Sequence, residues 1–134
     1  MKIKLHFSLL LIAMAGFFVA QQANAQCRGL VLSAIDIEDE WKVTLATGDD
    51  AVDEIGSTYT FKRDGEATYT GFGVAATIYY EFTLNGSRLT LRPAFGDGYD
   101  VYCVELMDGM LVMTLIESTT YDLSGEFELM LDPA

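Results

Sequence analysis

The sequence has a single histidine, His6, and it lies in an N-terminal segment that we expect the mature protein to lose. Without imidazole the mature chain cannot assemble a Ser-His-Asp or Cys-His catalytic centre. It also lacks the usual protein ligand of zinc, copper and iron. Hydrolases and metal sites of these kinds are excluded. We therefore expect no enzyme, no resident metal and no cofactor.

Basic side chains are scarce as well. If Lys2 and Lys4 leave with the N-terminal segment, the eight Lys and Arg become six, against twenty Asp and Glu. Nucleic acid and anionic membrane surfaces repel so acidic a chain, so neither is an expected partner. No later apolar run is long enough to span a bilayer, and we expect no membrane-spanning segment. The sequence names no protein partner.

The first 25 residues have the pattern of a secretory signal peptide. Lys2 and Lys4 precede an apolar stretch from 7 to 20, and Ala23-Asn24-Ala25 follows as an A-x-A cleavage site. We therefore predict cleavage after Ala25 and a single exported domain over residues 26–134, in the periplasm or outside the cell. The 109 residues that remain of 134 suit one modest core and leave no room for a second domain.

The sequence has only two cysteines, Cys27 and Cys103. Disulfides persist in exported proteins, so we predict that these two pair. The alternative for Cys27 is lipid attachment after signal removal. That reaction prefers a small residue immediately before the cysteine, and Gln26 stands there instead. We expect the disulfide rather than the lipid anchor.

Three Asx-Gly pairs separate runs in which apolar and polar residues alternate. They are Asp64-Gly65, Asn85-Gly86 and Asp108-Gly109, and each favours a tight reversal because Gly and Asx tolerate positive φ. The predicted fold is all-β, an antiparallel up-and-down meander of about eight strands closed into a barrel. A two-sheet sandwich is the alternative. The predicted strands cover residues 41–46, 57–62, 67–72, 77–84, 87–92, 99–106, 110–117 and 126–131, with one helical turn within 49–55.

Each reversal also predicts a register. We expect two-residue loops at Asn85-Gly86 and Asp108-Gly109, and a three-residue loop at the first reversal with Gly65 as its left-handed residue. The predicted inner-face pairs are Phe82 with Leu89, Val104 with Met113, and Phe61 with Tyr69. The outer face of the hairpin over 99–117 is apolar too, and we expect residues 30–35, tethered by the disulfide, to cover it.

With these strands in place, the chain resembles the small lipocalin-like proteins exported by Bacteroidota-type bacteria, over residues 38–131. The resemblance rests on Trp41, Tyr59-x-Phe61-x-x-Asp64-Gly65, Tyr80-x-Phe82-x-Leu84-Asn85-Gly86-x-x-Leu89-x-Leu91 and Leu111-Val112-Met113. It implies a calycin-like barrel. Typical lipocalins carry Gly two residues before the Trp and a late Arg across it. Here Asp39 stands at the first place and no Arg follows Arg92, so the resemblance implies no particular ligand.

An eight-stranded barrel either fills its interior with side chains or holds one small ligand. Aromatic rings with polar hydroxyls suit a small apolar or amphipathic molecule. The candidate ligand-binding residues on the predicted inner face are Tyr59, Phe61, Tyr69, Tyr80, Phe82, Tyr102, Met113 and Phe127. The alternative is that these rings simply form the core of a structural or protein-interaction module of the cell envelope.

Two acidic groups, at residues 36–40 and 49–54, carry oxygen atoms of the kind that calcium binds. Neither matches an EF-hand loop, and we favour solvated loop charge. Catalysis by a pair of carboxylates, as in glycosidases, needs no histidine. The spacing of the acids singles out no such pair.

Overall fold

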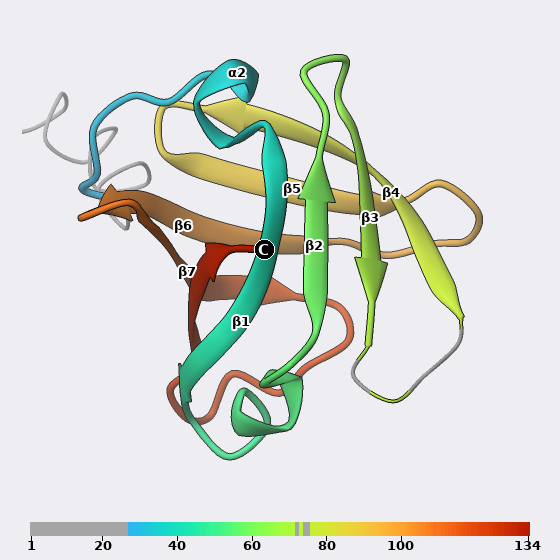
Figure 1. Cartoon of the computed structure of the whole chain (residues 1–134). Coiled ribbons are helices and arrows are strands. Elements are labelled where there is room, and N and C mark those ends of the chain that lie inside the picture. The colour runs from blue at the N-terminus through green and yellow to red at the C-terminus, as the bar shows by residue number, and fades with distance from the viewer. Residues whose placement is uncertain (1–26, 72, 74–75) are drawn as a thin grey trace, which may run out of the picture.

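The structure is a computed structural model that describes residues 27–71, 73 and 76–134; the predicted signal peptide lies outside these residues. Within them the chain forms eight antiparallel strands in a closed barrel, each strand beside its sequence neighbours and β1 beside β8 (Figure 1). The predicted fold class is confirmed, and the architecture is consistent with a calycin-like barrel. The strands are β1 (Asp39–Thr47), β2 (Thr58–Phe61), β3 (Glu66–Thr70), β4 (Thr77–Asn85), β5 (Arg88–Pro93), β6 (Asp100–Met107), β7 (Met110–Ser118) and β8 (Glu128–Pro133).

The β6–β7 hairpin has the predicted register, with Val104 opposite Met113. The other two predicted registers are wrong by two residues. Phe82 lies opposite Leu91 rather than Leu89, because the turn is made by Gly86 and Ser87 instead of Asn85 and Gly86. Since side chains alternate with a period of two, a shift of two residues keeps every side chain on its predicted face.

The first hairpin does have a three-residue loop. The Lys62 amide donates to Glu66, the Gly65 amide donates to Lys62, and Gly65 has a φ of 94°. The loop therefore spans residues 63–65, and Phe61 lies opposite Ala67, not Tyr69. Tyr69 is instead opposite Tyr59, with the two ring centres 5.0 Å apart. This correction places two tyrosines side by side on the inner face.

The barrel closes through β1 and β8, and this pairing contains an irregularity. The register shifts between Val43 and Leu45, which lie opposite Leu131 and Met130. A bulge of this kind reverses the alternation beyond it. Leu45 is therefore 58% exposed, although Trp41, Val43 and Leu45 alternate in the sequence as one apolar face.

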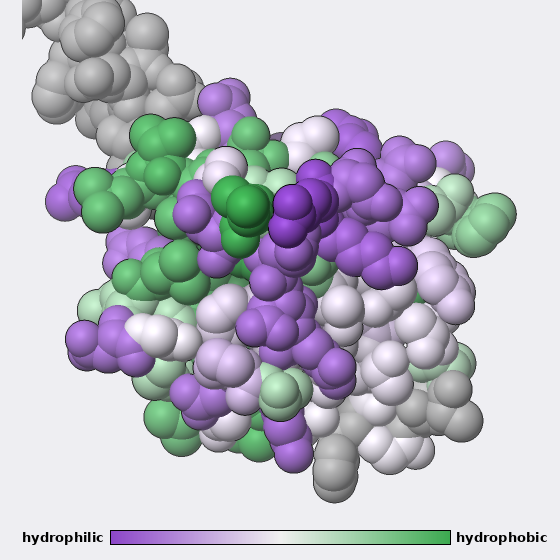
Figure 2. All heavy atoms as spheres, turned by 45° about the horizontal axis from the view of Figure 1, so that its top comes forward, coloured by the Kyte–Doolittle hydropathy of each residue, from purple (hydrophilic) through white to green (hydrophobic). Residues whose placement is uncertain are grey.

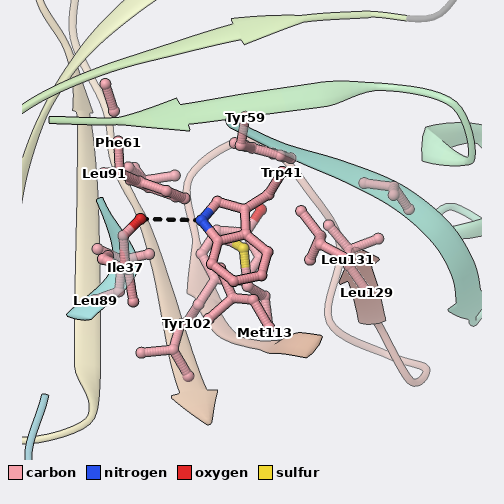
Figure 3. Close-up of a cluster of buried hydrophobic side chains, with 14 of the residues drawn as sticks. Ile37, Trp41, Tyr59, Phe61, Leu89, Leu91, Tyr102, Met113, Leu129 and Leu131 are labelled. Carbon is pink, nitrogen blue, oxygen red and sulfur yellow. Dashed lines mark hydrogen bonds between the residues drawn. The ribbon is translucent and has the colours of Figure 1, made fainter. Parts of the chain in front are cut away.

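One end of the barrel is closed by the short helix α2 (Ala34–Ile37), which precedes β1. Ile37 is fully buried there, and its carbonyl accepts a hydrogen bond from the Trp41 indole at 2.9 Å (Figure 3). Leu89, Leu129 and Leu131 fill the space around them. We call this the closed end. It is an ordinary apolar core whose one indole donor is satisfied.

The disulfide between Cys27 and Cys103 is present and fixes the N-terminal segment to β6. The segment then meets the β4–β5 turn, where the Leu32 amide donates to the Gly86 carbonyl at 3.0 Å. The predicted apolar cover is wrong, however. Leu30 and Val31 are 87% and 81% exposed, and Met107 is also exposed. The segment is held by the disulfide and the backbone. Leu32 and Ala34 are partly buried against the core, whereas Leu30, Val31 and Ile35 point to solvent.

Among the described residues, no helix is long and apolar enough to cross a membrane.

Candidate functional site at the open end

The end of the barrel opposite α2 carries the tyrosines. β2, β4 and β6 begin at this end and β3 finishes there, so Tyr59, Tyr80, Tyr102 and Tyr69 all approach it. They surround a cavity of about 140 Å³. We call this the open end. The residues that line the cavity are Tyr59, Tyr69, Ile78, Tyr80, Leu91, Asp100, Tyr102, Thr120 and Tyr121.

Glu54 brings a carboxylate to this ring of tyrosines. It ends the short 3-10 helix Val52–Glu54 in the β1–β2 loop, whose backbone folds back through bonds between Val43 and both Gly56 and Ser57. The Tyr69 hydroxyl donates to Glu54 at 2.5 Å and the Tyr121 hydroxyl at 3.3 Å. One carboxylate therefore links three separate parts of the chain across the open end.

These contacts keep the phenols neutral. Burial, together with the hydrogen bond to Glu54, raises the pKa of Tyr69 to about 12. Burial and the nearby Glu54 charge also raise the pKa of Tyr121. Tyr69 uses its only O–H to donate to Glu54. The Ser57 hydroxyl, 3.3 Å from the Tyr69 oxygen, is therefore the donor in the bond between Ser57 and Tyr69.

Tyr59 and Tyr102 form the floor of the cavity. Both are buried, at 6% and 1% exposure, and their hydroxyls share a hydrogen bond. Burial raises the pKa of each well above its ordinary value. The two phenols lie at the boundary between the apolar core and the cavity, and among the described residues no buried side-chain nitrogen or oxygen is left without a partner.

Asp100 is the second carboxylate at the cavity. It begins β6 opposite Leu91, and it is half-buried with a hydrogen bond from the Ser118 hydroxyl. Burial raises the pKa of Asp100, and the Ser118 hydrogen bond partly opposes that shift. Burial and the Asp100 charge in turn raise the pKa of Tyr80. The cavity therefore has a negative wall.

The eight candidate residues predicted from the sequence divide into two groups. Tyr59, Tyr69, Tyr80 and Tyr102 line the cavity. Phe61, Phe82 and Met113 lie deeper in the packed core (Phe61 and Met113 are labelled in Figure 3), and Phe127 packs against Tyr121 with ring centres 4.9 Å apart. Whether any of the eight contacts a ligand stays a prediction.

Three ionisable residues of the site were missed from the sequence. Asp100 had a signal, because it is in phase with Tyr102 and Val104 on the inner face of its strand. Glu54 and Tyr121 had none that strand periodicity could reveal, because both lie in connections that fold back over the open end.

Two of the other acidic residues that had been candidates for calcium have protein partners. Asp36 accepts hydrogen bonds from the Ser33 amide and hydroxyl, and Glu38 forms a salt bridge with Arg63 at 2.6 Å. In the part of the chain that the structure describes, no three His, Cys, Asp or Glu side chains are grouped to hold a metal ion.

Comparisons with known protein families, with curated proteins and with solved structures find no significant match to this chain.

Proposed function

We propose that this chain is an exported, lipocalin-like binding protein that holds a small amphipathic molecule at the open end of its barrel. The observation that carries the proposal is the cavity of about 140 Å³ among five tyrosines. Rings give such a molecule apolar contact, while hydroxyls and carboxylates bind its polar group. Ligand pockets for drug-sized molecules are about 300 Å³ or more, so the ligand is smaller than these.

Export is the second part of the proposal. The Cys27–Cys103 bond supports it, because disulfides persist in oxidising compartments outside the cytoplasm. It also favours the disulfide over a lipid anchor at Cys27, since one sulfur cannot make both bonds. The intact mass of the exported protein should equal that of a chain that begins at Gln26 and lacks two hydrogens. A diacylglycerol adduct would contradict both the cleavage site and the disulfide.

We propose binding rather than catalysis. The open end brings Glu54 and Asp100 towards the same tyrosines, as both charges contribute to the raised pKa of Tyr80. Glycoside hydrolysis by two carboxylates needs room for a sugar ring and a water or leaving group between them. The small volume of the cavity supports a binding site for a compact molecule instead.

Native mass spectrometry of freshly purified protein tests the proposal. We expect a co-purifying small molecule that is lost in Tyr80→Trp, because the larger side chain fills the cavity. Tyr79→Trp is the matched control, since Tyr79 is the neighbouring residue on the outer face and is exposed. Bare polypeptide in the wild type, or equal loss in both variants, would contradict binding in the cavity.

A protein-interaction module with a filled core is the second candidate. Exposed apolar side chains gather around the closed end, where Leu30, Val31, Ile35, Leu106 and Met107 are exposed (Figure 2). Patches of this kind often mark contacts with other proteins. This candidate predicts bare polypeptide in the same mass spectrum, together with an assembly that Leu30→Ser disrupts.

A further inference from the structure

The charge and shape of the open-end cavity restrict the ligand further, and the argument rests on the proposed function. Among the described residues that line the cavity, none is basic, and Asp100 is acidic. Glu54 adds a second carboxylate through its bonds to two of the lining tyrosines. The phenols stay neutral at neutral pH, because their pKa values lie above the ordinary one. All fixed charge at this cavity is therefore negative.

An anionic ligand would meet repulsion from both carboxylates. A neutral apolar ligand would displace water from the charged Asp100 carboxylate without giving it a new hydrogen-bond or ionic partner. That desolvation costs binding free energy. A cation has neither cost. It gains from the carboxylates directly, and the faces of tyrosine rings attract cations within about 6 Å of the ring centre.

The size of the cavity adds a limit. Its volume of about 140 Å³ equals roughly five water molecules at liquid density, so only a compact group fits. Ile78 and Leu91 supply an apolar side for a short alkyl chain. The net negative charge of the chain, −12 over the full sequence, also attracts cations from solution.

We propose that the open-end cavity binds a small organic cation, an alkylammonium group, with Asp100 and Glu54 as its counter-charges and the tyrosine rings around its alkyl part. The group belongs either to a free amine or to the end of a lysine side chain. The two sources share the same chemistry at the site, and the experiment separates them.

The test is a set of NMR titrations of the full mature protein at neutral pH and low salt. The probes are n-butylammonium chloride, 1-butanol, sodium butanoate and Nα-acetyl-lysine amide. We expect n-butylammonium to shift amide signals at the open end and to bind at least about tenfold more tightly than 1-butanol. Butanoate should not bind. Equal binding of n-butylammonium and the lysine amide would indicate that the natural ligand is a lysine side chain of a peptide. Tighter binding of n-butylammonium would indicate a free amine. Both outcomes support binding of a cation.

Two variants complete the test. Asp100→Asn keeps the volume and an acceptor for Ser118 but removes the charge, and it should weaken n-butylammonium binding by about tenfold. Glu54→Gln should act in the same direction. Asp97→Asn is the control, because Asp97 is an exposed acid in the preceding loop.

The failures are distinguishable. If 1-butanol binds as tightly as n-butylammonium and Asp100→Asn changes neither affinity, the proposal of a cationic ligand is overturned and the proposed site for an amphipathic molecule stands. If none of the probes shifts signals at the open end while a co-purifying molecule is seen in the wild type and lost in Tyr80→Trp, the cation alone is overturned. If no co-purifying molecule is seen either, both proposals are overturned.

Discussion

The two ends of the barrel are built by the same strands, yet they differ in chemistry. At the closed end Ile37, Trp41 and Leu89 are buried in one apolar cluster, and the indole is the polar group among them. At the open end, five tyrosines and Asp100 line a cavity, and Glu54 accepts hydrogen bonds from two of those tyrosines. The comparison teaches that polarity changes along each strand as well as across it.

The change can be followed residue by residue. β2, β4 and β6 all run from the open end to the closed end. Their successive inner residues are Tyr59 then Phe61, Tyr80 then Phe82, and Asp100, Tyr102 then Val104. In each strand a tyrosine lies nearer the open end than Phe61, Phe82 or Val104, although in β4 the apolar Ile78 comes before Tyr80 at the cavity. A polar inner residue at a strand end can reach water or another polar group, whereas one in the middle cannot.

The largest effect that we predict tests whether the closed end is stabilised independently of the open end. Replacing Cys27 and Cys103 together by Ser opens a bridge across 76 residues of sequence. In the chain-entropy model the free energy of unfolding should fall by about 4 kcal/mol, as measured in urea. Ligand binding at the open end should not change under conditions where the variant stays folded. A loss of binding in the folded variant would show that the two ends are coupled.

The next effect compares the ends within one strand. Leu89 and Leu91 share the inner face of β5 and are both buried, but Leu91 lines the open-end cavity. Leu89→Ala should lower the free energy of unfolding by about 3 kcal/mol, because it leaves a new void in close-packed surroundings.

Leu91→Ala is the matched variant. It should lower the free energy of unfolding by clearly less than Leu89→Ala, because it enlarges a cavity that already exists instead of creating a new one. Thermal unfolding of both variants gives the difference. Equal losses would mean that the open end is as tightly packed as the closed end.

The smallest effect concerns the phenols. The folded pKa of Tyr69, about 12, lies above its ordinary value of 10.0. The unfolded chain therefore releases this proton first, and the stability that Tyr69 contributes is lost as the pH rises from about 10 to 12. Glu54→Gln removes one of the causes and should move tyrosinate absorbance to lower pH. Burial remains as the larger cause, so the pKa of Tyr69 should stay above 10.0. An unchanged absorbance titration would show that Glu54 does not contribute to the raised pKa of Tyr69.

Much of the fold could be predicted from local patterns. Alternation and three Asx-Gly reversals were enough to predict eight strands and their inner faces, and even the wrong registers preserved those faces because they differed by two residues. The position of Leu45 could not be predicted. The bulge that turns it outward arises where β1 meets β8, and these strands lie at opposite ends of the described barrel sequence.

The candidate site was only half visible in the sequence. Four of its tyrosines lie on strands and were found by their period. Asp100 has the same phase as Tyr102 but was missed. Glu54 and Tyr121 lie in loops, where no period applies. Their meeting depends on how the β1–β2 and β7–β8 connections fold over the same opening.

The sequence by itself determined the hairpins, the inner and outer faces and the order of tyrosine before phenylalanine along the strands, because each depends on residues near one another in the chain. Only the tertiary structure decided how far the interior is filled, which side chains remain at the cavity and which carboxylates face it. These depend on the volumes and loop paths of segments far apart in sequence, and close packing couples all of them at once.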